Sequence, residues 1–266
     1  MGTIKVAVHG ALGRMGEEVI GALCREPEMQ LVGAVDVAAS EGSLAKPDGS
    51  GSVPLSSDLD SILKGCQPDV LVDFTIAKAT MPAARIAAEQ GVNLVIGTSG
   101  ITTDNLDEIA RLASAHKIGA VVVANFALGA VLMMHLAKIA GKYFDYAEII
   151  ELHHERKLDA PSGTSLTTAR DMVKAKGKPF LQPSAKGAAQ VSRGQAIEGI
   201  SIHSVRLPGM LAHQEVILGG PGQTLSIRHD TINRECYMPG VIMAVKEVVN
   251  HRGLIYGLDK LLGLGE

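Results

Sequence analysis

The sequence predicts an α/β protein with a doubly wound parallel sheet, followed by a second α+β domain with a mixed sheet. In the first 125 residues, short β-branched apolar runs alternate with longer segments of helical period, which is the pattern of βαβ units. The pattern changes after Asn125. There, two strand-like runs flank Gly219-Gly220-Pro221-Gly222, a hairpin signal that parallel βαβ architecture does not use.

The strands predicted in the first half are nearly continuous in apolar residues, as expected of strands covered on both faces. These strands span residues 4–9, 30–36, 69–74, 92–96 and 119–124. The covering helices are predicted at residues 15–25, 78–90 and 103–116. The stretch from Ala39 to Ser57 is rich in Gly, Ser, Pro and Asp, so it is predicted to be a long loop.

The second half alternates between helical and strand-like segments less regularly. We expect a helix at 128–142, a strand at 145–153, a helix at 162–176, a polar stretch at 177–198 and strands at 200–206, 213–218 and 224–230. The last 30 residues return to helical period and are expected to pack back on the first domain. We therefore predict a dinucleotide-binding domain from residues 1–125 with 235–266, and a substrate-binding and oligomerisation domain from residues 126–234.

Composition and charge narrow the class of protein. The chain has 25 Lys+Arg against 28 Asp+Glu, a net charge of −3, without the basic excess that nucleic acids or anionic membranes require. Cys24, Cys66 and Cys236 have neither zinc-site nor disulfide spacing, so we expect free thiols in a reducing cytosol. The sequence opens directly into a strand and no apolar run approaches the roughly 20 residues of a membrane span. The expectation is a cytoplasmic protein without nucleic-acid or membrane partners.

A glycine-rich turn follows the first predicted strand and opens a helix. In His-Gly-Ala-Leu-Gly-Arg-Met-Gly at residues 9–16, Gly10, Gly13 and Gly16 stand where a tight turn brings backbone N–H groups against a pyrophosphate. The spacing is GxxGxxG rather than the commoner GxGxxG. Asp36, however, ends the second strand 20 residues beyond Gly16, where a carboxylate can bind the adenosine ribose. These features favour a Rossmann-like dinucleotide site over a plain strand-turn-helix.

Two further loops follow predicted strands. They are Gly97-Thr98-Ser99-Gly100 and Ala124-Asn125-Phe126. Ligands of open α/β sheets bind at the carboxyl ends of the strands, so both loops are candidates to hold the nicotinamide end of the nucleotide. The alternative interpretation is two ordinary turns, in which these residue types are common.

Residues 151–164 concentrate ionisable groups between a strand end and a helix start. They read Glu-Leu-His-His-Glu-Arg-Lys-Leu-Asp-Ala-Pro-Ser-Gly-Thr. An HExxH zinc site would need a histidine at the position of Leu158, and a GxSxG hydrolase motif fails at Thr167. A solvated charged loop would leave residues 161–164 without a role. The segment is therefore more informative than a charged surface loop.

Residues 161–164, Pro-Ser-Gly-Thr, instead predict a helix N-terminus, whose free N–H groups and positive dipole end bind carboxylate or phosphate. Lys157 adds a positive charge to this anion site. His153 or His154 could supply a proton near neutral pH, because a free imidazole titrates at about 6.5. The sequence thus indicates an anionic substrate and proton transfer, without a metal.

The motifs GxxGRMG at 10–16 and ExHHxxKxDAPSGT at 151–164 together resemble those of the 4-hydroxy-tetrahydrodipicolinate reductase family, also called dihydrodipicolinate reductases, of the diaminopimelate route to lysine. The resemblance spans essentially the whole chain, through Asp73-Phe74-Thr75, Gly97-Thr98-Ser99, Ala124-Asn125-Phe126, His203-Ser204-Val205-Arg206 and Arg234-Glu235. The chain departs from the family at Ser99, usually Thr, and at Tyr237-Met238-Pro239, commonly Phe-Ala and a small residue.

The resemblance implies roles for individual residues. His153 looks like the catalytic acid and Lys157 like the second proton donor, while His154, Gly163 and Thr164 look like ligands of the substrate's carboxylates. The nicotinamide-nucleotide contacts that it implies are Gly10, Ala11, Leu12, Gly13, Arg14, Met15, Asp36, Gly97, Thr98, Ser99, Val123, Ala124, Asn125 and Phe126.

The implied reaction is the reduction of the cyclic dicarboxylate 4-hydroxy-tetrahydrodipicolinate to tetrahydrodipicolinate by NADH or NADPH. Asp36 slightly favours NADH, because a carboxylate repels a 2′-phosphate, although Arg14 could approach such a phosphate. Two alternatives stay open: a related oxidoreductase for another small carboxylate, and a non-catalytic nucleotide-binding regulator. The resemblance also implies a homotetramer built through the sheet of the second domain.

Overall fold

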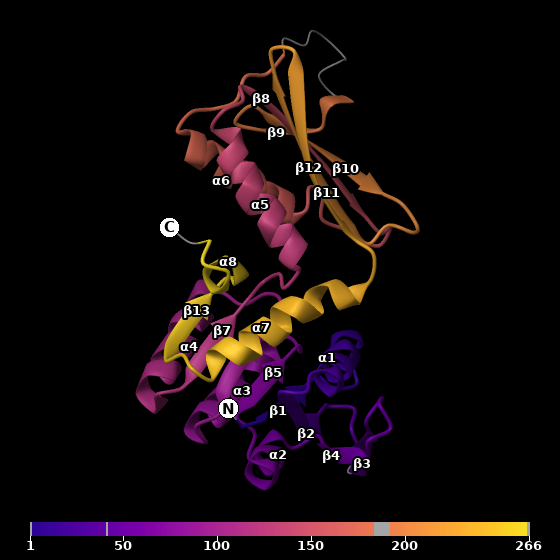
Figure 1. Ribbon diagram of the computed structural model, residues 1–266, viewed down its shortest axis with the longest axis vertical. Coiled ribbons are helices and arrows are strands. Elements are labelled where there is room, and N and C mark those ends of the chain that lie inside the picture. Colours follow the sequence, from indigo (N-terminus) through magenta and orange to yellow (C-terminus); the bar gives the residue numbers. More distant parts are fainter. Residues whose placement is uncertain (1, 41, 184–191, 265–266) are drawn as a thin grey trace. The chain divides into compact units, whose positions relative to one another are not determined.

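The computed structural model describes residues 2–40, 42–183 and 192–264. The chain forms two compact units, Met1–Leu128 with Arg234–Glu266 and Gly129–Asn233. The first unit is built on an eight-stranded sheet and the second on a five-stranded sheet (Figure 1). The fold is therefore α/β with a second mixed-sheet unit, as the sequence predicts.

The sheet of the first unit runs in the order β13-β7-β6-β5-β1-β2-β4-β3. Its strands are β1 (Ile4–His9), β2 (Met29–Val35), β3 (Gly42–Ala45), β4 (Ser52–Ser56), β5 (Val70–Asp73), β6 (Asn93–Ile96), β7 (Gly119–Val122) and β13 (Gly253–Tyr256). Its helices are α1 (Arg14–Arg25), α2 (Leu59–Cys66), α3 (Ala77–Glu89), α4 (Thr103–His116), the 3-10 helix η2 (Arg234–Tyr237), α7 (Met238–Val248) and α8 (Leu258–Leu261). The strands and helices predicted before residue 125 are confirmed, with ends shifted by a residue or two.

The strand order of this sheet reverses beside its middle strand. From β1 the chain proceeds to β2 and β4 on one side and then to β5, β6 and β7 on the other. Both β2 and β5 lie parallel to β1. An open α/β sheet leaves a crevice at the carboxyl ends of the strands where the order reverses. The ends of β1 and β5, at His9 and Asp73, therefore mark the place where a ligand is expected.

The predicted loop at residues 39–57 is wrong. β3 and β4 form an antiparallel pair, and β4 adds to β2 in parallel. Only Val53 is buried in this pair, which lies at the edge of the sheet, so its sequence has little of the apolar signal by which strands are predicted. The helical prediction for the last 30 residues likewise missed β13, which pairs in parallel with β7.

The second unit is a mixed sheet covered by two helices on one face (Figure 1). Its elements are α5 (Leu128–Gly141), β8 (Tyr146–His153), α6 (Gly163–Lys176), β9 (Gln195–Ile197), β10 (Ile200–Arg206), β11 (Ala212–Gly220) and β12 (Gln223–Thr231). The order is β12-β11-β8-β10-β9, and the predicted hairpin is confirmed as the antiparallel pair β11 and β12. Residues 184–191 of the predicted polar stretch lie outside the described residues.

Two layers make the core of the second unit. Met133 of α5 and Met172 of α6 pack over Ile149, Ile202 and other apolar residues that alternate along the central strands. Because neighbouring residues of a strand point to opposite faces, Glu151 and His153 share the helix-covered face of β8 with Ile149. No described helix is long and apolar enough to cross a membrane.

Candidate active site

The turn after β1 accepts only glycine at two of its positions. Gly10 has φ +83°, and a Cβ there would lie 2.9 Å from the carbonyl oxygen of Phe74. A Cβ on Gly16 would lie 2.1 Å from the carbonyl oxygen of Gly10. Helix α1 begins here without a side-chain cap, and helix geometry leaves the N–H groups of Arg14 and Met15 without intrahelical acceptors. The turn thus offers a close backbone approach and free donors, which fits a pyrophosphate.

Asp36 lies beside this turn. Its Oδ2 accepts the N–H of Leu12 at 3.0 Å, and its Oδ1 accepts the N–H of Ala38 at 2.9 Å. The carboxylate is therefore held at the end of β2 next to the glycine turn, where the ribose of a dinucleotide is expected. The neighbouring Val37 is 95% exposed and offers no charge to a 2′-phosphate.

The loops after β6 and β7 reach the same edge of the sheet. The N–H of Gly97 donates to the carbonyl of Asp73 at 2.9 Å, and the N–H of Val123 donates to that of Ile96 at 3.0 Å. The rings of Phe74 and Phe126 lie 5.7 Å apart. The structure thus brings the glycine turn together with the loops at 97–99 and 123–126, all of which the sequence indicated as nucleotide contacts. Together they fit an extended dinucleotide.

A buried carboxylate joins three strand ends at this edge. Asp73 accepts hydrogen bonds from the N–H of Thr75 at 2.8 Å, its hydroxyl at 2.6 Å, the hydroxyl of Thr98 at 3.1 Å and Nδ1 of His9 at 3.2 Å. Burial raises the pKa of Asp73, but the hydrogen bonds from His9 and Thr75 outweigh it and keep that pKa below its usual range. Sequence reasoning assigned Asp73 no role. The sequence signal that could have indicated a role for Asp73 is its position as a carboxylate at the end of an apolar strand.

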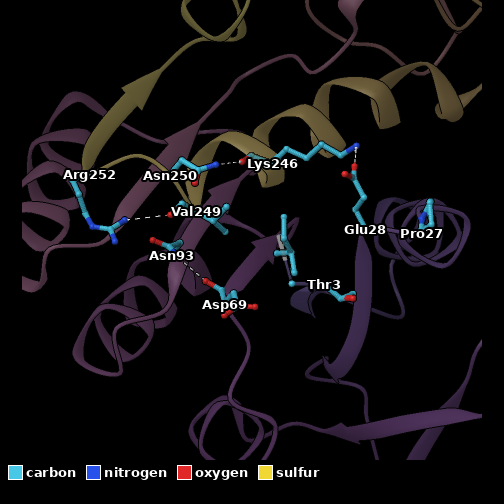
Figure 2. A pocket seen from close by; sticks show the side chains of 11 residues that line it. Thr3, Pro27, Glu28, Asp69, Asn93, Lys246, Val249, Asn250 and Arg252 are labelled. Carbon is cyan, nitrogen blue, oxygen red and sulfur yellow. Dashed lines mark hydrogen bonds and ion pairs between the residues drawn. The ribbon is translucent and has the colours of Figure 1, made fainter.

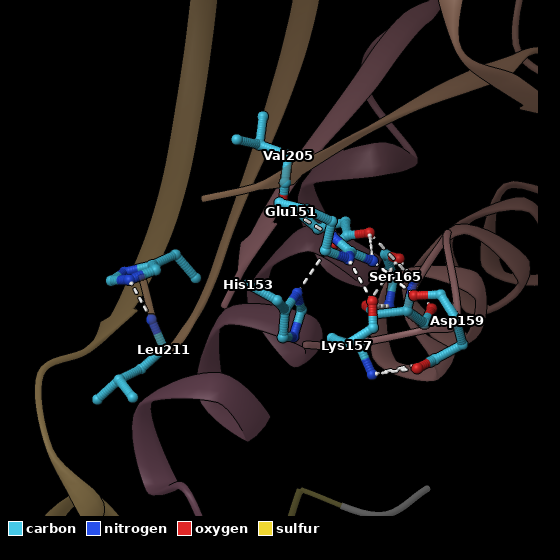
Figure 3. Close-up of polar contacts among 10 residues, drawn as sticks. Glu151, His153, Lys157, Asp159, Ser165, Val205 and Leu211 are labelled. Carbon is cyan, nitrogen blue, oxygen red and sulfur yellow. Dashed lines mark hydrogen bonds and ion pairs between the residues drawn. The ribbon is translucent and has the colours of Figure 1, made fainter. Parts of the chain in front are cut away.

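In the second unit, His153 is held by a buried carboxylate (Figure 3). Nδ1 of His153 lies 2.5 Å from Oε2 of Glu151, two residues earlier on β8. Arg206, from the neighbouring strand β10, donates from Nη1 and Nη2 to the two oxygens of Glu151 at 2.9 and 2.8 Å. Burial raises the pKa of Glu151, but the hydrogen bonds from His153 and Arg206 prevail and set that pKa at about 2. The carboxylate is therefore ionised at neutral pH.

Lys157 lies in the loop between β8 and α6. Its ammonium donates to both carboxylate oxygens of Asp159 at 2.8 Å (Figure 3). This hydrogen bond lowers the pKa of Asp159, whose side chain is 59% exposed. The side chain of Lys157 is itself 22% exposed, so an incoming carboxylate can compete with Asp159 for its ammonium. Lys157 is thus a cation available to an anionic ligand.

The start of α6 provides donors for an anion. The side chain of Ser162 caps the helix by accepting the N–H of Ser165 at 3.2 Å, while the N–H groups of Gly163 and Thr164 have no intrahelical acceptor. A Cβ on Gly163 would meet nothing within 4 Å, so the backbone is approachable. His154 precedes this helix, and its Nδ1 is buried without a hydrogen-bond partner among the described residues. The segment from the end of β8 to the start of α6 therefore carries all five residues indicated for catalysis and substrate binding.

A separate cavity of about 770 Å³ lies in the first unit at the amino ends of the strands (Figure 2). Asp69 and Asn93 line it at the amino ends of β5 and β6, and Lys246 and Arg252 line it from the C-terminal segment. None of the indicated nucleotide contacts is among its lining residues. Within the described ranges, no three His, Cys, Asp or Glu side chains are grouped to hold a metal ion.

The doubly wound sheet with its glycine turn, and the histidine–carboxylate pair of the second unit, define an oxidoreductase that uses a nicotinamide nucleotide. Sequence profiles of the dihydrodipicolinate reductase N-terminus and C-terminus match residues 4–126 and 129–262. The chain belongs to the dihydrodipicolinate reductase family, which confirms the resemblance drawn from the two motifs. It is an NAD(P)H-dependent enzyme.

Similar proteins match nearly the full length of the chain. The 4-hydroxy-tetrahydrodipicolinate reductase of Dehalococcoides mccartyi is 56% identical over 99% of this chain and 100% of its own length. That of Moorella thermoacetica is 48% identical over 98% of both chains. The solved dipicolinate-bound dihydrodipicolinate reductase of a Paenisporosarcina species is 38% identical, covers 97% of this chain and 99% of its own, and superposes with a TM-score of 0.85.

Proposed function

We propose that this protein reduces 4-hydroxy-tetrahydrodipicolinate to tetrahydrodipicolinate in the biosynthesis of diaminopimelate and lysine. The observation that carries the proposal is the segment 151–164, from the end of β8 to the start of α6. It joins a carboxylate-held histidine, a lysine and a helix N-terminus in a chain whose relatives bear the name of this reaction. Removal of the 4-hydroxyl consumes one hydride and one proton and releases water. The enzyme must therefore bind a dicarboxylate, admit a hydride and supply a proton.

His153 is the proposed acid and Lys157 the second proton donor. NADH or NADPH supplies the hydride when bound. Hydride arriving at an electron-poor ring carbon pushes charge toward the ring nitrogen, so a positioned acid lowers the barrier by protonating as the charge develops. The ammonium of Lys157 stabilises the same charge as a point cation. His153 ends β8 and Lys157 lies in the loop that follows.

The substrate's carboxylates are assigned to His154 and to the start of α6. The N–H groups of Gly163 and Thr164 point out of the positive end of the helix dipole, and such ends bind carboxylate. The unpartnered Nδ1 of His154 supports a ligand there, because a buried polar atom without a hydrogen bond is costly. A dicarboxylate can satisfy both places.

The nucleotide is assigned to the carboxyl edge of the first unit's sheet. The pyrophosphate lies against residues 10–15, the ribose of the adenosine against Asp36, and the nicotinamide end against residues 97–99 and 123–126. The closeness of Asp36 to the turn supports this placement and a preference for NADH, with NADPH also accepted. The protein is further proposed to be a cytoplasmic homotetramer.

The test is turnover of freshly generated substrate, followed by the absorbance of the nicotinamide. General acid catalysis is typically worth about 10²–10⁴-fold, so His153→Gln and Lys157→Ala should each lower kcat by a factor of that order. His154→Gln should mainly raise the substrate's KM, because it loosens carboxylate binding. The combined loss at His153 and Lys157 should be smaller than the product of the two single losses, since groups that act as a unit are not additive.

Melting temperature and NADH titration on each variant separate catalysis from folding. If these side chains merely shape the loop, their variants should lose stability and nucleotide affinity together with catalytic rate. A stable His153→Gln variant with normal NADH affinity and near-normal turnover would exclude the proposed acid. A wild-type protein that binds NADH without turning over the substrate would instead be the nucleotide-binding regulator.

A further inference from the structure

Glu151 is a fully buried carboxylate that is hydrogen-bonded to residues around the loop of the proposed site. Besides His153 and Arg206, it accepts the N–H of Ser162 at 3.2 Å, the residue that caps α6. A buried charge is costly unless it is paired and hydrogen-bonded. Here the partners that satisfy it lie on β8, on β10 and at the start of α6. One carboxylate therefore ties together the three elements around the loop.

Arg206 connects Glu151 to the backbone of the loop that follows β8. Its Nη2 donates to the carbonyl of Asp159 at 2.6 Å and its Nε to the carbonyl of Lys157 at 3.3 Å. The register of β8 and β10 places Arg206 opposite His153. The rigid guanidinium fork can thus hold the Glu151 carboxylate and the backbone that carries Lys157 at the same time.

The charge of Glu151 decides which ring nitrogen of His153 is free. An ionised carboxylate accepts hydrogen bonds and donates none, so the proton between Nδ1 and Glu151 belongs to Nδ1. The nitrogen left to exchange a proton with a substrate is then Nε2. Turning the ring over would break the bond to a buried charge. The same contact therefore sets the orientation and the tautomer of the imidazole.

We propose that the Glu151–Arg206 ion pair is the positioning device of the proposed active site: Glu151 fixes the imidazole of His153, and Arg206 fixes the loop that bears Lys157. This rests on the proposed function, since it assigns His153 and Lys157 their roles as proton donors. Glu151 is fully buried, and the guanidinium of Arg206 is engaged by Glu151 and by the carbonyls of Lys157 and Asp159. Their effect on the reaction passes through the two side chains that they hold.

The first test is Glu151→Gln. The amide keeps the shape of the side chain, but it is uncharged and turns an N–H group toward the donors of Arg206. The hydrogen bond that holds Nδ1 of His153 is then no longer fixed by a negative charge. Misplacement of a reacting group by about 1 Å can cost about 10²-fold in rate. We expect kcat to fall by about that factor, while the substrate's KM and the affinity for NADH stay unchanged. A merely structural role would move KM, NADH affinity and melting temperature instead.

Glu155→Gln is the matched control. It removes the same charge from the same segment, but the Glu155 carboxylate is exposed and pairs with the adjacent Arg156 at 3.6 Å. Its kcat should equal that of the wild type. An equal loss of kcat in Glu155→Gln would show that net charge, and not the contact with His153, matters, which would overturn the proposal.

A double variant keeps the test valid if the single variant unfolds. Glu151→Leu combined with Arg206→Met removes both charges at similar volume, and such replacements of buried ion pairs often preserve stability. We expect this variant to melt near the wild type and bind NADH normally, yet to be as slow as Glu151→Gln. Normal kcat in the folded double variant would overturn the positioning role. Turnover by the wild type tests the proposed function separately, so the two failures are distinguishable.

Discussion

Asp36 is the single residue on which the choice of cofactor depends most. Its carboxylate is fixed by the N–H groups of Leu12 and Ala38. The next residue, the exposed Val37, has no charge that would attract a 2′-phosphate. Asp36→Ala should therefore weaken NADH binding more than NADPH binding, because it removes both the ribose acceptor and the repulsion of the phosphate. Titration of the protein with each nucleotide measures the two dissociation constants.

Asp48→Ala provides the control for this prediction. Asp48 is an exposed loop carboxylate that accepts the N–H of Ser50 at 2.9 Å, away from the glycine turn along the chain. Its replacement should leave both affinities unchanged. Equal losses for NADH and NADPH in Asp36→Ala would mean that Asp36 does not lie at the ribose.

At the scale of elements, the loop after β6 depends on close contact with the end of β5. A Cβ on Gly97 would lie 2.2 Å from Cε1 of Phe74, whose ring packs against Phe126. Gly97→Ala must therefore push the Phe74 ring away from its place, and overpacking of this kind typically costs about 1–3 kcal/mol. We expect a lower melting temperature and weaker NADH binding, both measurable on the purified variant.

Gly65→Ala is the same substitution in open space. Gly65 lies within α2, and a Cβ there would meet nothing within 4 Å. Since alanine favours helix over glycine, this variant should melt at or above the wild-type temperature and bind NADH normally. If Gly97→Ala behaves like Gly65→Ala, the loop after β6 does not need the close contact for which we argue.

The elements that could be predicted from sequence are those with a strong apolar period. The buried strands β1, β5 and β6 and the helix α4 are examples, because burial on both faces or on one stripe leaves a pattern in the residues. The edge strands β3 and β4 are polar and lack that pattern, so their sequence predicts a loop. Edge pairing is decided by the backbone of a neighbouring strand, which the local sequence does not contain.

The same distinction applies to the candidate site. His153 and Lys157 could be indicated from residue type and motif alone. The link of Glu151 to Arg206 depends on the pairing of β8 with β10, which are separated by 46 residues in the sequence. The network of Asp73 likewise joins Thr98, 25 residues away. A sequence shows which chemical groups are present, but strand register decides which of them meet.

At the scale of the whole molecule, the second unit has a sheet face that lies opposite α5 and α6 and that no described helix of this unit covers. Helices α5 and α6 pack on the face that carries Ile149, while Ile150, Leu152, Val205 and Ile217 alternate to the other face and are only partly buried. The same face carries the pairs of Glu148 with His203 and of Glu215 with Arg228. Its partly exposed apolar side chains favour burial against another surface. A second copy of the same face is the partner that a symmetric homo-oligomer supplies.

Pairing of this one face gives a dimer, and the family resemblance implies that two such dimers form a homotetramer. We expect sedimentation of the purified protein to give a mass near four times 27.8 kDa. Ile217→Asp should shift the protein toward smaller species, because it places charges on the paired sheet faces, where they are costly to bury. Ser114→Asp, at an exposed position of α4 in the first unit, adds the same charge outside the sheet of the second unit and should leave the mass unchanged. Circular dichroism of the Ile217→Asp variant checks that the subunits stay folded. A wild-type protein that sediments as a monomer at micromolar concentration would contradict this assembly.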